Sequence, residues 1–140
     1  MVRKRTAKRI FEETYCRLAP SAVHGIGVFA VRQIPRGIDP FMIGIRYPRR
    51  WVSISRAELE QAPPGVKSLL TSLFVPDNNE RFRVPALGPN MADIGAYLNH
   101  STRPNMRTSD GHTFVTKLRI AAGEELTVDY QTFGAGILLT

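Results

Sequence analysis

Proline and glycine interrupt this chain throughout, and their distribution constrains its fold more than any other feature. The 140 residues include 10 prolines and 11 glycines, which are scattered rather than clustered. Because proline ends helices and central strands while glycine favours turns, this spacing predicts many short elements and argues against a bundle of long helices. A chain of this length is suited to one domain with its own core.

The C-terminal third of the sequence has the pattern of β-strands. In "FVTKLRI" (114–120) and "ELTVDY" (125–130), side chains alternate with a period of two, which is typical of half-buried strands. Asp110-Gly111 lies between strand-like runs and predicts a two-residue hairpin turn. Ser55 and Glu58 have capping-box spacing, which predicts a small helical insert over about residues 53–76. The fold class predicted from these patterns is mainly β with a small α insert.

Cysteine and histidine are too few to build a metal site. Cys16 is the only cysteine, and with His24, His100 and His112 it gives no zinc-ligand spacing. We therefore expect no structural metal and a reducing compartment. The N-terminus lacks the apolar run of a signal peptide, and the tail "GILLT" is far too short to span a membrane. These features predict an intracellular protein that is cytoplasmic, nuclear or nucleoid-associated.

Positive charge is concentrated in two places. The net charge is +7, and a basic N-terminal arm over residues 1–15 carries much of it. A second cluster, Arg46, Arg49 and Arg50, stands beside Trp51. Two interpretations stay open, a solvated arm that keeps the protein soluble and a nucleic-acid-binding surface.

The stretch "HGIGVFA" (24–30) contains Gly25-x-Gly27-x-x-Ala30, a version of the dinucleotide-binding glycine fingerprint. That fingerprint needs a helix to begin within it, because the helix N-terminus holds the pyrophosphate. Here "VFAVRQIPRG" follows, which is rich in strand-forming residues and reaches Pro35 before a useful helix could form. The two glycines therefore predict a turn between strands, with backbone that a ligand can approach closely.

Three motifs taken together resemble the SET domain of protein lysine methyltransferases. They are the Gly-x-Gly turn with "VFAVRQIPRG", then "NHSTRPN" (99–105), then "GEELTVDY" (123–130), and they occur in the same order as in that family. The resemblance covers about residues 16–134 and implies a single domain over 16–140. It also implies several short twisted sheets around a C-terminal pseudoknot, an exception to the rule that chains are not threaded.

The resemblance assigns roles to particular residues. The residues implied to hold S-adenosylmethionine are Gly25, Ile26, Gly27, Asn99 and His100. Tyr130 would be the catalytic tyrosine, and the substrate channel would be lined by Tyr130, Val128, Phe133 and Tyr47. Val128 stands where the family usually carries phenylalanine or tyrosine, so its smaller side chain would leave room for higher methylation states.

The function implied is that of an S-adenosylmethionine-dependent protein-lysine N-methyltransferase, acting on histone-type chromatin tails or on another protein lysine. One alternative is a SET-fold binding or scaffold protein with weak or lost transfer. Another is a basic nucleic-acid-binding module that uses the N-terminal arm. In many members of the family a cysteine-rich segment after the domain closes the channel. This sequence has "FGAGILLT" in that place, so we expect the apolar tail, or a second subunit in a homodimer, to close the channel.

Overall fold

Short strands in three small sheets form the framework of the protein. The computed structural model describes residues 6–41, 51–77, 79–109, 111 and 113–132. Its strands are β1 (Cys16–Pro20), β2 (Ile26–Ala30), β3 (Trp51–Ile54), β4 (Phe82–Pro85), β5 (Asn99–His100), β6 (Met106–Arg107), β7 (Val115–Thr116) and β8 (Glu125–Val128). Its helices are α1 (Ala7–Glu13), α3 (Arg56–Glu60), α4 (Pro64–Leu73) and the 3₁₀ turns η1 (Pro89–Met91), η2 (Ile94–Tyr97) and η3 (Tyr130–Thr132). No helix within these described ranges is long and apolar enough to cross a membrane.

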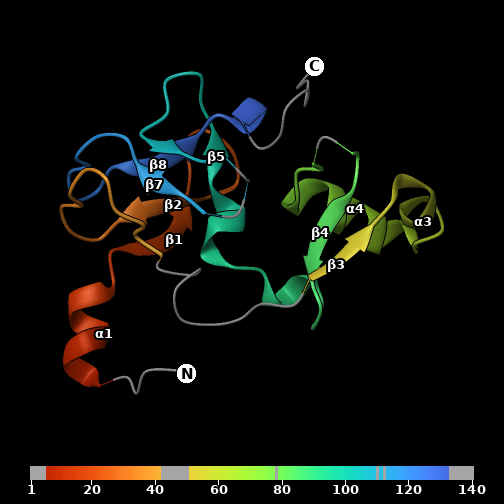
Figure 1. Cartoon of the computed structure of the whole chain (residues 1–140), viewed down its shortest axis with the longest axis horizontal. Coiled ribbons are helices and arrows are strands. Elements are labelled where there is room, and N and C mark those ends of the chain that lie inside the picture. The colour runs from red at the N-terminus through yellow and green to blue at the C-terminus, as the bar shows by residue number, and fades with distance from the viewer. Residues whose placement is uncertain (1–5, 42–50, 78, 110, 112, 133–140) are drawn as a thin grey trace.

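The main sheet brings together an N-terminal and a C-terminal part of the described chain (Figure 1). Its strand order is β1-β2-β8-β5, so the C-terminal strand β8 lies between the N-terminal hairpin and β5. The β1–β2 and β2–β8 pairs are antiparallel, and Val28 pairs with Leu126 across the second of them. β5 runs parallel to β8, with Asn99 opposite Thr127. Residues from the glycine turn and from the "NHSTRPN" motif are thereby held in one sheet, on either side of β8.

The hydrophobic core lies against this sheet and follows the alternation seen in the sequence. Leu126 and Val128 are fully buried, whereas Glu125 and Thr127 between them are only half-buried. The other buried members of this core are Val28, Ala30, Ile34, Leu98, Met106, Phe114 and Ile120. Each large apolar side chain buried in this way contributes about 1.5–3 kcal/mol relative to remaining exposed.

Residues 101–105 run along the outer edge of β8. The backbone N–H of Ser101 donates to the Val128 carbonyl over 3.1 Å. The Asn105 side chain donates to the Glu125 carbonyl over 2.8 Å and accepts from the Thr127 N–H over 2.9 Å. One asparagine amide thus supplies the donor and the acceptor that a further strand would offer. The expected C-terminal pseudoknot stays a prediction, because residues after Thr132 lie outside the described part of the chain.

The helical insert forms a second lobe. It begins at β3 and ends at β4, which pair antiparallel, so it extends beyond both ends of the range 53–76 predicted from the helices alone. It has a small core of its own, made of Leu59, Leu70, Phe82 and Val84. The expected capping box is present, because the Ser55 hydroxyl accepts from the Glu58 N–H and the Glu58 carboxylate accepts from the Ser55 N–H.

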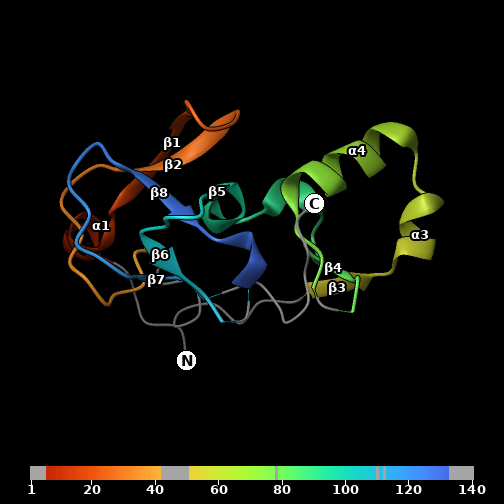
Figure 2. The same cartoon turned by 90° about the horizontal axis from the view of Figure 1, so that it is seen from above.

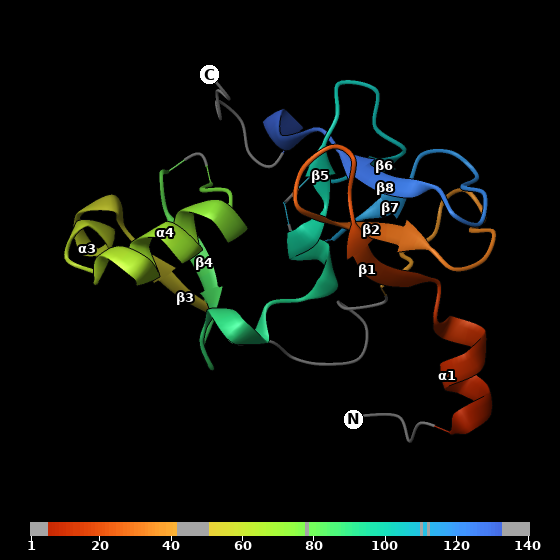
Figure 3. The ribbon, with the colours of Figure 1, turned by 180° about the vertical axis from the view of Figure 1, so that it is seen from behind.

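The segment from η1 to β5 lies between the insert and the main sheet. The top view and the back view agree with the front view on this arrangement (Figures 2 and 3). This segment also supplies Leu98 to the main core and Asn99 to the sheet. Any site formed between the two lobes must therefore include residues of this segment.

The predicted two-residue turn at Asp110-Gly111 is wrong. β6 and β7 do pair antiparallel, but each has only two residues, with Met106 opposite Thr116. Residues 108–114 therefore separate the strands. Phe114 directly precedes β7, is 5% exposed, and packs edge-to-face on Phe41 in the core. The register, with Arg107 opposite Val115, leaves an odd number of residues between the strands, which a two-residue turn does not allow.

Part of the basic arm is helical. The Thr6 hydroxyl caps α1 by accepting from the Arg9 N–H over 3.3 Å. Lys8 and Glu12, and Arg9 and Glu13, form ion pairs one helical turn apart. Two of the basic charges in the arm therefore have partners on the same helix.

Cys16 provides a test of this packing. It is half-buried at the start of β1, and burial together with the nearby Asp39 raises the pKa of its thiol from 9.0 to about 12. At about pH 8 the thiolate fraction, and with it the rate of reaction with Ellman's reagent, should be about a thousandfold lower in the folded protein than after unfolding in guanidinium chloride. Equal rates in the two states would contradict the described packing of β1.

Candidate functional site

A tight turn between β1 and β2 carries the first glycine motif. Gly25 has a φ of +46°, a left-handed conformation that favours glycine, and a Cβ at this position would meet nothing within 4 Å. The Ser21 N–H donates to the Gly25 carbonyl over 2.8 Å, and the Ser21 hydroxyl accepts from the Val23 N–H over 2.9 Å. The turn is thus closed by its own hydrogen bonds while space beside Gly25 stays open.

Gly27 requires glycine for a different reason. A Cβ built on it would lie 2.3 Å from the Glu125 Oε2 atom and 3.0 Å from the Ser21 Cβ. The Ser21 hydroxyl donates to both oxygens of this carboxylate, over 2.7 and 2.9 Å. The carboxylate of Glu125 therefore occupies the space that a side chain at position 27 would need.

Asn99 connects the turn to β5. It is 7% exposed, and its Nδ2 donates to the His24 carbonyl over 3.0 Å and to Glu125 Oε2 over 2.9 Å. A longer contact of 3.4 Å reaches the Ile26 carbonyl. No hydrogen bond to Asn99 Oδ1 is found among the described residues, so this oxygen is the part of the amide that a ligand could use.

His100 and Tyr130 form the other half of the cluster. The Tyr130 N–H donates to His100 Nδ1 over 3.1 Å, and the two ring centroids are 5.3 Å apart. Since Nδ1 accepts this bond, the proton of a neutral imidazole is on Nε2. Asp129 Oδ1 lies 3.7 Å from the same Nδ1. The histidine thus fixes the start of η3 through its side chain.

The Tyr130 phenol points back toward the segment before β5. Its hydroxyl donates to the Leu98 carbonyl over 2.5 Å. Burial raises the pKa of Tyr130 above 10.0, because the phenolate would lose its hydration. The hydroxyl is therefore a protonated donor under ordinary conditions.

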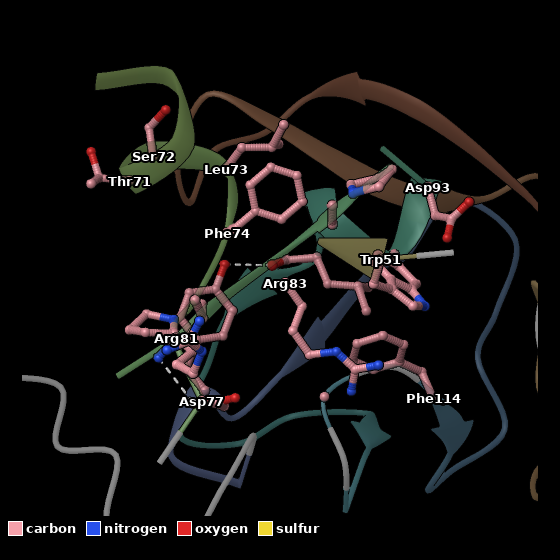
Figure 4. Close-up of a pocket in the computed structure, with 18 residues that line it drawn as sticks. Trp51, Thr71, Ser72, Leu73, Phe74, Asp77, Arg81, Arg83, Asp93 and Phe114 are labelled. Atoms are coloured by element: carbon pink, nitrogen blue, oxygen red, sulfur yellow. Dashed lines mark hydrogen bonds between the residues drawn. The ribbon is translucent and has the colours of Figure 1, made fainter. Parts of the chain in front are cut away.

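A pocket of about 300 Å³ opens where the insert meets the main core. Trp51, Phe74 and Arg83 of the insert line it, together with Phe114 and Tyr130 of the core, and Figure 4 shows the labelled side chains around it. Arg83 also lies 5.7 Å from the centre of the Trp51 ring. Tyr130 belongs both to this pocket and to the cluster with His100.

The structure brings together six of the predicted site residues. They are Gly25, Ile26, Gly27, Asn99, His100 and Tyr130, and they are joined through the contacts above. Val128 is placed elsewhere, since it is fully buried in the main core and does not line the pocket. Tyr47 and Phe133 lie outside the described residues. In the described ranges no group of three or more His, Cys, Asp or Glu side chains is placed to hold a metal.

Sequence reasoning missed several residues of this site. Ser21 and Glu125 have no distinguishing pattern of their own, since they meet only through the pairing of β2 with β8. Trp51 and Phe74 belong to the part of the chain that the motifs match least. A weak signal existed for Glu125, because "GEELTVDY" places a carboxylate at the start of a strand expected to be half-buried.

The predicted nucleic-acid surface is only partly described. The basic residues Arg3, Lys4, Arg5, Arg46, Arg49 and Arg50 lie outside the described ranges. Within them, Lys8 and Arg9 are paired with glutamates on α1. The nucleic-acid interpretation stays a prediction.

Comparison with known proteins adds independent information. Residues 25–131 match the family model described as the SET domain. A crystal structure of a Plasmodium falciparum protein, described as a candidate histone methyltransferase, is similar with a TM-score of 0.50 and 19% sequence identity. The similarity covers 84% of this chain and 93% of that one. A search of curated proteins gave no match.

The matched region contains all three motifs and the six site residues that the structure brings together, along with the main sheet from β2 to β8. The mostly β architecture with a few short helices agrees with that family's fold, as the structural similarity does. From the family match and the geometry, we conclude that this chain belongs to the SET-domain family.

Proposed function

We propose that the protein is an S-adenosylmethionine-dependent protein-lysine N-methyltransferase. The observation that carries this proposal is the position of Tyr130. Its backbone N–H is bound by His100 of the "NHSTRPN" motif, and its side chain lines the pocket beside the insert. SET-domain methyltransferases use this cofactor, and a residue that contacts both the motif residues and the pocket supports the close approach that transfer between two bound molecules requires.

The residues present fit the cofactor. Backbone groups of Gly25, Ile26 and Gly27 would contact it, because the space that a Cβ at Gly25 would occupy is open. Asn99 Oδ1, without a partner among the described residues, would accept from the ammonium of its amino-acid end. His100 would contact the adenine side. When bound, the cofactor supplies a methyl group on a sulfonium, which passes to a neutral amine as the carbon–sulfur bond breaks.

The pocket would receive the lysine side chain of a protein substrate. Its lining includes the aromatic rings of Trp51, Phe74 and Phe114, whose apolar surface would disfavour the ammonium form of an entering amine. This effect matters because lysine in water has a pKa of about 10.4, and only its neutral form has a lone pair for the methyl group. The Tyr130 hydroxyl would orient the amine, since Tyr130 is one of the residues that line this pocket.

The class of substrate protein is proposed from the similar solved structure. The similar Plasmodium falciparum protein is described as a candidate histone methyltransferase, and histone-type tails are accordingly the first substrates to examine. We include other protein lysines in the proposal, because much of the pocket lining comes from the insert, which the shared motifs do not cover.

Replacing Tyr130 with phenylalanine tests its assigned role. Tyr130→Phe removes the hydroxyl bonded to Leu98 but keeps the ring, so we expect cofactor binding to persist while methyl transfer falls by about a hundredfold or more. The measurement is transfer of labelled methyl to histones and to a lysine-peptide library, beside calorimetric binding of S-adenosylmethionine.

Tyr97→Phe is the matched control, since Tyr97 packs on the main core and does not line the pocket. Unchanged transfer in Tyr130→Phe would contradict the role of the hydroxyl. Cofactor binding without transfer by the unaltered protein would favour the scaffold alternative.

The pH dependence of transfer gives a second test. Burial raises the pKa of Tyr130 above 10.0, so the phenol keeps its proton and its donor role at every pH below that value. With an excess of peptide, kcat should rise with pH as the bound amine loses its proton, with a midpoint below the pKa of about 10.4 of lysine in water, and should show no fall caused by Tyr130 below pH 10. A falling limb below pH 10 that disappears in Tyr130→Phe would show instead that the tyrosine ionises earlier.

A further inference from the structure

Glu125 lies where the glycine turn, the N-terminal hairpin and β5 meet, and the proposed chemistry gives it no role. We propose that Glu125 is a positioning residue for S-adenosylmethionine, which holds the Asn99 amide and the glycine turn in the arrangement that binds the cofactor's amino-acid end. This proposal rests on the function proposed above.

The first argument is the orientation of the Asn99 amide. An ionised carboxylate only accepts hydrogen bonds, so Glu125 Oε2, at 2.9 Å, requires the Asn99 nitrogen rather than its oxygen to face it. The His24 carbonyl, at 3.0 Å, imposes the same choice. These two acceptors leave Oδ1 on the opposite side of the amide, where it presents an acceptor to a bound ammonium group.

The second argument is that one carboxylate holds both segments. The Ser21 hydroxyl, which also accepts from the Val23 N–H inside the turn, donates to Glu125 over 2.7 and 2.9 Å. The carboxylate also fills the space next to Gly27. The position of the turn relative to Asn99 therefore depends on one side chain that comes from β8.

The third argument is charge. Glu125 is half-buried, and none of the ion pairs found among the described residues involves it. Its negative charge is offset by hydrogen bonds alone. An ammonium group bound at the nearby Asn99 oxygen would be attracted to it at short range.

The test is calorimetric titration of three ligands into the full chain and into Glu125→Gln. The amide of glutamine cannot accept from both Ser21 and Asn99 without turning its own donor toward one of them. We expect binding of S-adenosylmethionine and of S-adenosylhomocysteine to weaken about tenfold, corresponding to about 1.4 kcal/mol. Binding of 5′-methylthioadenosine, which lacks the amino-acid end, should change by less than about twofold.

Glu124→Gln is the matched control. Glu124 is the preceding residue and is exposed, and among the contacts described its carboxylate bonds only to the Ala121 N–H of its own turn. Its affinities for all three ligands should equal those of the unaltered protein. Ser21→Ala serves as the second variant if Glu125→Gln does not fold, and it should weaken the same two ligands to a smaller extent.

Different outcomes separate this inference from the function on which it rests. An equal loss of affinity for all three ligands, or no loss for any, would overturn the positioning role while leaving the methyltransferase proposal intact. If the unaltered protein binds S-adenosylmethionine in no measurable amount, the proposed function fails and this role fails with it.

A double-substitution cycle tests the contact directly. Gly27→Ala places a Cβ where Glu125 Oε2 lies, so it should displace the carboxylate and weaken S-adenosylmethionine binding about tenfold or more. In a Glu125→Ala background the same substitution should have a clearly smaller effect, because the group it displaces is already absent. Fully additive effects on the dissociation constant would contradict the proposed coupling.

Discussion

The pairing of β2 with β8 is the constraint on which the rest of the site depends. It sets Val28 opposite Leu126 in the core and Phe29 opposite Glu125 at the end of the ladder. A slip of one residue would turn Leu126 toward solvent and bring Glu125 toward the core, at a cost of several kcal/mol from lost apolar burial and from an unpaired charge. Core packing thereby also fixes the contact between Glu125 and the glycine turn. The parallel pairing of β5 then places Asn99 against the same carboxylate.

Features that depend on neighbouring residues could be predicted from the sequence. The alternation in residues 114–120 correctly placed Phe114, Thr116 and Ile120 inside, although Leu118 on the same side is 57% exposed. The capping box at Ser55 and the helices after it were recognised because side chain and backbone meet within one turn. The mainly β class and the turn between two strands at Gly25 followed from similarly local rules.

Features without a local apolar pattern, and features that depend on distant residues, could not be predicted. The α1 helix is short and has no buried residues, so it shows none of the apolar periodicity by which helices are recognised. The loop at 108–114 follows from the register in which β6 and β7 pair, with Met106 opposite Thr116, and the Asp110-Gly111 dipeptide does not determine that register. The family could nevertheless be predicted, because the three motifs are recognised by their residues and their order in the sequence, without knowledge of the contacts that they make. The contact of Ser21 with Glu125 could not be predicted, because the two residues are 104 positions apart in the sequence and meet only through the pairing of β2 with β8.

The division of the molecule into two lobes explains why the motifs indicate chemistry more clearly than substrate. The residues proposed to hold the cofactor all come from the main core, whereas Trp51, Phe74 and Arg83 reach the pocket from the insert. The insert has a separate hydrophobic core, so its pocket-facing side chains can change without disturbing the pairing of β2 with β8. The backbone N–H of Tyr130 is held by His100 of the main sheet, and the Tyr130 side chain lines the pocket together with residues of the insert. Both lobes therefore contribute to the surroundings of Tyr130. On the proposed function, substitutions in the insert would alter which protein is methylated, while those around Glu125 would alter whether the cofactor binds.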